Sequence, residues 1–144
     1  MLSFAGLSTD GRMISFRQMI KPRKGEATGP IVVSFFATWC VPCRKGLPII
    51  QKVADDFKDR GVRVILVASG ENADDVKPFL KKLGVTQTVV PDPYLTITKR
   101  LGVQKSLPRT LVIDEKGTLR TIFGSEGEEF SEELKNSLTI PTKS

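Results

Sequence analysis

Short apolar runs alternate with amphipathic stretches along most of the chain. Residues 31–36 and 62–68 are rich in β-branched or aromatic side chains, which predicts strands buried on both faces, as in a parallel sheet. An amphipathic stretch follows each run, with its apolar residues at the spacing of one helix face. These residues are Leu47, Ile50, Val53, Ala54 and Phe57 in the first stretch, and Val76, Phe79, Leu80 and Leu83 in the second.

Capping residues indicate where the two predicted helices begin and end. Gly61 and Gly84 follow the last apolar residues, and glycine is favoured where a helix ends in the left-handed conformation. Asn72 lies at the start of the second helix, where its side chain can accept hydrogen bonds from free backbone N–H groups. Asp75, three residues later, loosely fits the geometry of a capping box.

The remaining segments complete a single domain of 144 residues. Hairpins are predicted around Thr9-Asp10-Gly11, and around Glu115-Lys116-Gly117 between strands 109–114 and 118–123. We also expect a loop over residues 21–30, a brief strand at Val89-Val90, a short helix over residues 93–101, a last helix with Phe130, Leu134 and Leu138, and a disordered tail over residues 139–144. This order of elements indicates an α/β fold, in which helices flank a central mixed sheet.

Composition excludes several kinds of site. The chain has 22 lysine and arginine residues against 16 acidic ones, but no aromatic residues interleave with the basic ones as a nucleic-acid platform requires. We therefore expect a solvated basic surface, with at most a weak preference for acidic proteins or anionic headgroups. The chain has no histidine, which excludes Ser–His and Cys–His nucleophilic pairs and zinc sites of cysteine and histidine.

Export and membrane signals are absent from the sequence as given. No apolar run approaches the roughly 20 residues of a membrane span. Residues 1–10 lack the basic region and the sustained apolar core of a signal peptide. We therefore expect either a cytosolic protein or a form from which a leader has been removed.

The chemistry centres on the segment Trp39-Cys40-Val41-Pro42-Cys43. Cys40 follows a predicted strand and a predicted helix starts at Cys43, so free N–H groups and the helix dipole favour a thiolate there. The thiolate is the form that attacks disulfides, and Pro42 fits a first helical turn, where its missing N–H is not needed. Structural cysteines or half of a metal site are the alternatives, but the chain has no second CxxC motif.

The segment from Phe35 to Arg44 resembles the active-site signature of thioredoxin-like proteins. Pro48 lies where this family carries a helix-kinking proline. The segment 106–110, Ser-Leu-Pro-Arg-Thr, resembles the family's cis-proline loop, which faces the two cysteines. The resemblance implies a thioredoxin-like fold and a cis peptide bond between Leu107 and Pro108.

The resemblance also implies a role for each site residue. Cys40 is expected to attack a disulfide of a partner protein, and Cys43 to resolve the mixed disulfide. The partner is expected to dock on Trp39, Val41, Pro42, Leu107 and Pro108. No metal and no cofactor besides the redox-active Cys40–Cys43 disulfide are implied, and we expect a monomer.

A finer resemblance is to the TlpA/ResA branch, the extracytoplasmic thiol reductases tied to cytochrome maturation. It is carried by the N-terminal hairpin, the WCxPCR motif with its following proline, and the inserted helix over residues 72–83. It implies a reductant of protein disulfides, with an upstream thiol protein as its electron partner. It also implies a location outside the cytoplasm, such as the bacterial periplasm, with the leader absent from this chain.

Two acids of the family are missing. Thioredoxins carry a buried aspartate where this chain has Ser34, and many TlpA/ResA-like reductases carry a glutamate where it has Gly46. These acids tune the cysteines or accept the resolving proton in the family. Glu71 is a candidate substitute as proton relay, because sites in open α/β folds lie at the carboxyl ends of strands. Otherwise Glu71 is an exposed loop carboxylate, Ser34 a small strand residue, and water the proton acceptor.

Three other functions remain open on the same fold. A thiol peroxidase would use a lone cysteine activated by threonine and arginine rather than a CxxC pair. A Cu(I) carrier could use both thiolates, although carriers on related folds usually add a histidine. An adaptor would keep the two cysteines without turnover.

Overall fold

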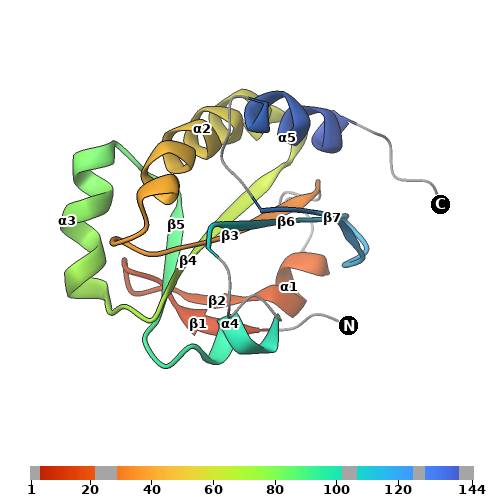
Figure 1. The fold of residues 1–144 in the computed structure, drawn as a ribbon. Helices are drawn as coiled ribbons and strands as arrows, with labels where there is room; N and C mark the ends of the chain where they lie inside the picture. Colours follow the sequence, from red (N-terminus) through yellow and green to blue (C-terminus); the bar gives the residue numbers. More distant parts are fainter. Residues whose placement is uncertain (1–3, 22–28, 102–106, 125–128, 140–144) are drawn as a thin grey trace.

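A mixed sheet of five strands, in the order β5-β4-β3-β6-β7, runs through the centre of the molecule (Figure 1). The computed structural model describes residues 4–21, 29–101, 107–124 and 129–139. The strands are β3 (Ile31–Phe36), β4 (Arg63–Ser69), β5 (Thr88–Asp92), β6 (Arg109–Ile113) and β7 (Leu119–Phe123). Strands β3, β4 and β5 are parallel, whereas β6 is antiparallel to β3 and to β7.

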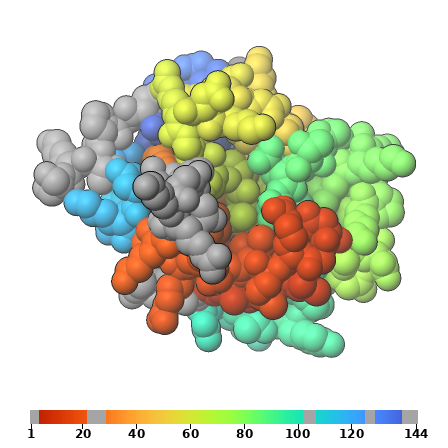
Figure 2. All heavy atoms as spheres, turned by 180° about the vertical axis from the view of Figure 1, so that it is seen from behind, coloured from red at the N-terminus to blue at the C-terminus, as the bar shows by residue number. Residues whose placement is uncertain are grey.

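Helices cover both faces of this sheet. One face carries α2 (Val41–Phe57), the 3₁₀ turn η1 (Lys58–Arg60), α3 (Ala73–Leu83) and α5 (Phe130–Thr139). The other face carries α1 (Phe16–Ile20), α4 (Thr96–Arg100) and the hairpin of β1 (Ala5–Leu7) and β2 (Met13–Ser15). From behind, the red atoms of the hairpin cover the lower part of the molecule, with α4 below them (Figure 2). The predicted α/β architecture, with its N-terminal hairpin and inserted helix, is confirmed.

Strand β3 is buried on both faces because its side chains alternate between two apolar cores. Val32 and Phe36 lie in the core beneath α2, whereas Ile31, Val33 and Phe35 lie in the core beside α1 and α4. A strand placed in this way excludes water from both of its sides, which is the environment that a mainly apolar run predicts.

The predicted ends of the long helices agree with the backbone, with the 3₁₀ turn η1 between α2 and Gly61, whereas α2 begins at Val41 rather than at Cys43. Gly61 and Gly84 have φ angles of 78° and 70°, in the left-handed region that glycine adopts at low cost. The side chain of Asn72 accepts a hydrogen bond from the N–H group of Asp75 at 3.1 Å and so caps α3. Pro48 lies inside α2, at the position that the family resemblance implied.

Helix α1 was not predicted, since the sequence indicated only a hairpin around Thr9-Asp10-Gly11 before the loop over residues 21–30. Ser15 caps this helix by accepting a hydrogen bond from the N–H group of Gln18 at 3.4 Å. Phe16 is fully buried and stacks on Phe4, with ring centroids 5.2 Å apart. A helix of five residues depends on such tertiary contacts, because its length alone cannot stabilise it.

The region between β5 and α4 also differs from expectation. Strand β5 has five residues rather than two, and α4 begins at Thr96 rather than at position 93. Leu95 has a φ angle of 60°, so the chain turns sharply before the helix starts. The buried carboxylate of Asp92 accepts hydrogen bonds from the N–H groups of Ile97 and Thr98, which fixes the start of α4.

Two predicted segments fall mainly outside the described residues. The expected loop over residues 21–30 is described only at its ends. Of the expected tail over residues 139–144, only Thr139 is described, as the last residue of α5. Among the helices of the described ranges, none combines the length and the apolar character that crossing a membrane requires.

One buried polar pair joins the two strands that meet at the middle of the sheet. Ser34 of β3 and Thr110 of β6 are directly opposite in the antiparallel register. Each is 1% exposed, and their hydroxyl oxygens are 3.0 Å apart, with either able to donate. Ser34 shares the face of β3 that carries Val32 and Phe36, so the pair lies beneath α2.

We expect Ser34→Ala and Thr110→Val each to destabilise the protein by about 1–3 kcal/mol, because each leaves one buried hydroxyl without its partner. The double variant should lose clearly less than the sum of the two, because it removes both polar groups together. Urea unfolding followed by circular dichroism gives the four free energies of this cycle. Strictly additive losses would show that the two hydroxyls do not interact.

Candidate active site

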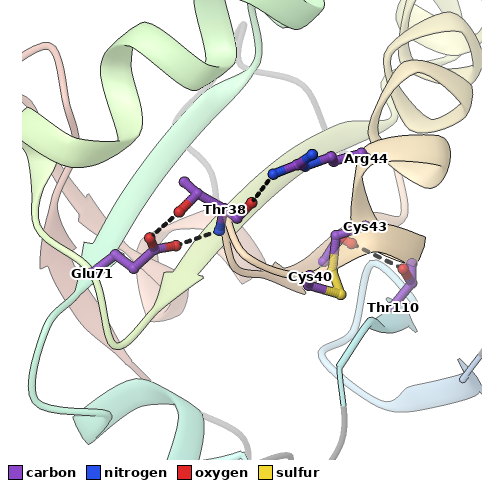
Figure 3. The surroundings of a disulfide bond; sticks show 7 residues. Thr38, Cys40, Cys43, Arg44, Glu71 and Thr110 are labelled. Carbon is purple, nitrogen blue, oxygen red and sulfur yellow. Dashed lines mark hydrogen bonds between the residues drawn. A yellow bond between two sulfur atoms is a disulfide. The ribbon is translucent and has the colours of Figure 1, made fainter.

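Cys40 and Cys43 form a disulfide at the junction between β3 and α2 (Figure 3). Cys40 precedes the helix with an extended backbone, at φ −86° and ψ 108°, whereas Cys43 lies in the first helical turn. The N–H group of Cys40 donates to the carbonyl of Ala37 at 3.1 Å, which closes the turn that leaves the strand. The two Cα atoms are 5.3 Å apart, so the fold brings the predicted redox pair together.

The surroundings of the disulfide are much more exposed than the cysteines themselves. Cys40 is 5% exposed and Cys43 1%. Trp39 and Val41, on either side of Cys40, are 69% and 60% exposed, and Pro42 is exposed as well. The surface beside Cys40 is therefore exposed and largely apolar.

The start of α2 gives a positive environment to a sulfur atom. The helix runs for 17 residues, and its first turn contains no acidic residue. Arg44 and Lys45 are exposed beside it. The free N–H groups and the dipole of the helix stabilise a thiolate at this end relative to a neutral thiol. The arrangement suits a sulfur that is released as an anion and then attacks another disulfide.

The peptide bond between Leu107 and Pro108 is cis, as the resemblance implied. Strand β6 begins at Arg109, which is opposite Phe35 near the end of β3. Because these strands are antiparallel, the start of β6 lies beside the end of β3, where Cys40 follows. Leu107 is half-buried and Pro108 is buried. The topology therefore brings the cis-proline segment and the exposed residues around Cys40 to the same edge of the sheet.

Glu71 lies at this edge too, but its carboxylate is engaged by Thr38. Glu71 follows β4, as Thr38 follows β3, and the two parallel strands are neighbours. The N–H group of Thr38 donates to Oε1 of Glu71 at 2.6 Å, and the Thr38 hydroxyl donates to Oε2. In Figure 3, Glu71 lies on the far side of Thr38 from the disulfide. The proton-relay role of Glu71 stays a prediction.

Neither position of the missing family acids carries a carboxylate in the structure. Ser34 is paired with Thr110, and Gly46 is buried in α2. Both Ser34 and Thr110 are buried, so a neutral hydroxyl pair lies in the sheet beneath α2 (Figure 3). Within the described ranges, no three histidine, cysteine, aspartate or glutamate side chains gather closely enough to hold a metal ion.

The sequence interpretation missed the surroundings of Thr38. Besides its two bonds to Glu71, Thr38 accepts at its carbonyl oxygen a hydrogen bond from Nη2 of Arg44, at 3.2 Å. The contact between Thr38 and Glu71 could have been predicted, because both residues lie just beyond the ends of adjacent parallel strands. Nothing local in the sequence signalled the role of Thr110, whose partner lies 76 residues away.

Comparisons with known proteins agree with this geometry. Residues 19–138 match the family model described as Redoxin. The thiol-disulfide oxidoreductase ResA of Halalkalibacterium halodurans is 29% identical over 118 residues, which are 81% of this chain and 66% of that protein. The chain thus spans about two thirds of the length of this curated relative.

Two crystal structures share the fold. A secreted Mycobacterium tuberculosis disulfide oxidoreductase homologous to E. coli DsbE is 20% identical, with a TM-score of 0.78 over 95% of each chain. A thiol:disulfide interchange protein of the thioredoxin family from Chlorobium tepidum is 23% identical, with a TM-score of 0.76 over 94% of this chain and 90% of that one. The fold is therefore thioredoxin-like, and the chain belongs to the Redoxin family, in its thioredoxin-like ResA/TlpA-like branch.

Proposed function

We propose that the protein is a thiol–disulfide oxidoreductase that exchanges disulfides with partner proteins. The observation that carries the proposal is the Cys40–Cys43 disulfide at the N-terminus of α2, beside the cis-proline segment. The ResA and DsbE-like proteins that resemble this chain are named for the same chemistry. The disulfide itself is the redox group, and no further cofactor enters the reaction.

The reaction passes two electrons in two exchange steps. The thiolate of Cys40 attacks one sulfur of the partner's disulfide, so that a mixed disulfide forms and the other partner sulfur leaves as a thiolate. The thiolate of Cys43 then attacks the sulfur of Cys40, which releases the second partner thiolate and forms the Cys40–Cys43 disulfide. The partner is reduced and this protein is oxidised, and an upstream thiol protein restores the dithiol.

The surface around Cys40 supports docking of the partner there. Trp39, Val41 and Pro42 are exposed on one side, and Leu107 and Pro108 line the neighbouring start of β6. An extended segment of the partner can lie between these two groups with its disulfide against Cys40.

The proton of Cys43 has two candidate acceptors, since no carboxylate replaces the family acids at positions 34 and 46. We propose that water accepts it, because both carboxylate oxygens of Glu71 already accept hydrogen bonds from Thr38. Glu71 is the alternative acceptor, if it leaves Thr38 during the reaction.

We propose further that the protein acts as a reductant outside the cytoplasm, in cytochrome c maturation. The resemblance to the TlpA/ResA branch supports the direction and the pathway. The secreted M. tuberculosis relative supports the location.

The wild-type protein should catalyse reduction of the insulin disulfides by dithiothreitol, and Cys40→Ser should abolish this catalysis because it removes the attacking sulfur. The measurement is the rate at which the freed insulin chains precipitate. Peroxide consumption is measured in parallel. A protein that consumed peroxide but left insulin oxidised would be a peroxidase, and the proposal would be wrong.

Cys43→Ser should accumulate a mixed disulfide with a fluorescent disulfide peptide, because the resolving thiol is missing. Cys40→Ser is the matched control and should accumulate almost none. The covalent product is quantified by non-reducing electrophoresis. Equal trapping by both variants, or trapping by Cys40→Ser alone, would contradict the assigned roles of the two cysteines.

A further inference from the structure

Every polar atom of Thr38 is bonded to a group from outside its own turn. Its N–H group and hydroxyl donate to the two carboxylate oxygens of Glu71, and its carbonyl accepts from Arg44 (Figure 3). Thr38 lies two residues before Cys40, in the turn closed by the bond from Cys40 to Ala37. The backbone that carries the reactive sulfur is therefore held from two sides.

We call the bonds that Glu71 and Arg44 make to Thr38 the Thr38 clamp. The inserted helix α3 contributes to both of its sides. Glu71 directly precedes Asn72, the residue that caps α3, so its backbone is tied to the start of that helix. The guanidinium of Arg44 lies over the ring of Phe79 from α3, with its carbon 6.0 Å from the ring centroid. Phe79 in turn stacks on Phe36, the last residue of β3, at 6.1 Å and 14°.

We propose that Glu71 and Arg44 are positioning residues that act through Thr38 to hold Cys40 against Cys43. The inserted segment then sets how strongly the disulfide is favoured over the two thiols. The inference rests on the proposed function, since it concerns the redox equilibrium of the same pair.

The turn at Thr38 can affect the redox equilibrium because the two cysteines are anchored differently. Cys43 is inside α2 and buried, so the helix fixes it. Cys40 precedes the helix, so its position depends on the turn that Thr38 belongs to. Two thiols held at bonding distance have a high effective concentration toward each other, which favours the intramolecular disulfide. Hydrogen bonds to an ionised carboxylate are strong enough to maintain such a geometry.

Loss of the clamp should therefore make the disulfide easier to reduce. We expect Glu71→Ala to lower the equilibrium constant for disulfide formation against glutathione by roughly three- to tenfold, or about 14 to 30 mV for a two-electron couple. Thr38→Val should lower the same equilibrium constant, because it removes the hydroxyl donor to Glu71. It does so without any change of charge. Asp74→Ala is the control, since it removes an exposed carboxylate from the first turn of α3.

The equilibrium is read by the fluorescence of Trp39, which is the single tryptophan and adjoins Cys40, and by mass after thiol alkylation. Thermal unfolding of the oxidised and the reduced forms is measured in parallel. A merely structural role would lower both melting temperatures and leave the glutathione equilibrium constant unchanged. A shift in that constant is therefore specific to positioning.

Glu71→Gln separates positioning from proton transfer, because its amide oxygen can still accept from the N–H group of Thr38. We expect the equilibrium constant to shift less than in Glu71→Ala, because the amide keeps one of the two acceptors but loses the charge, and we expect a normal rate of resolution. Slow resolution at an unchanged constant, together with a normal Thr38→Val variant, would make Glu71 a base and overturn the proposal. So would an unchanged constant in both Glu71→Ala and Thr38→Val. Should Glu71→Ala fail to fold, Thr38→Val carries the same prediction.

The wild-type titration separates this inference from the proposed function. A wild-type pair that does not equilibrate with glutathione defeats the proposed function and the inference together. A pair that equilibrates normally, with variants that match it, defeats the inference alone.

Discussion

The burial of β3 on both faces is the constraint on which the site depends. Its side chains alternate between two apolar cores, and hydrogen bonds to β4 and β6 fix it in the middle of the sheet. A strand held in this way cannot slide by one residue without exchanging the contents of both cores. The start of the turn that leads to Cys40 therefore has a fixed position. The helix that begins there supplies the field in which a thiolate is stable.

The order of the strands brings the other parts of the site to the edge of the sheet where Cys40 lies. The neighbouring parallel strand β4 leads to Glu71, and the antiparallel strand β6 starts just after the cis-proline bond. At the two positions where the family resemblance implies acids, this chain has Ser34 and Gly46. A neutral pair, Ser34 and Thr110, occupies the buried position, and the carboxylate at this edge is turned toward the backbone before Cys40. We propose that the charged groups at this edge hold the turn and that the proton of Cys43 passes to solvent.

Local signals predicted most of the fold, and pairings between distant segments could not be predicted. The apolar run of β3, the cap at Asn72 and the CxxC motif each lie within a few residues, and each was interpreted correctly. Helix α1 was missed because its stability comes from the packing of the buried Phe16 ring on Phe4 and not from a repeated apolar pattern along the helix. The bond between Thr38 and Glu71 joins residues 33 positions apart, and its existence depends on how two strands align. The family resemblance supplied the cis bond at Pro108, which the residues alone leave open.

We propose that Cys40 and Cys43 form one reversible redox couple. This is tested by a titration across glutathione and dithiothreitol buffers, with the thiols alkylated and counted by mass for each cysteine. A reversible couple gives a single two-electron transition between about −300 and −120 mV, in which both cysteines become labelled together. A disulfide that stays intact well below about −300 mV would be structural. That result, or separate labelling of the two cysteines, would show that the two cysteines are not one redox couple.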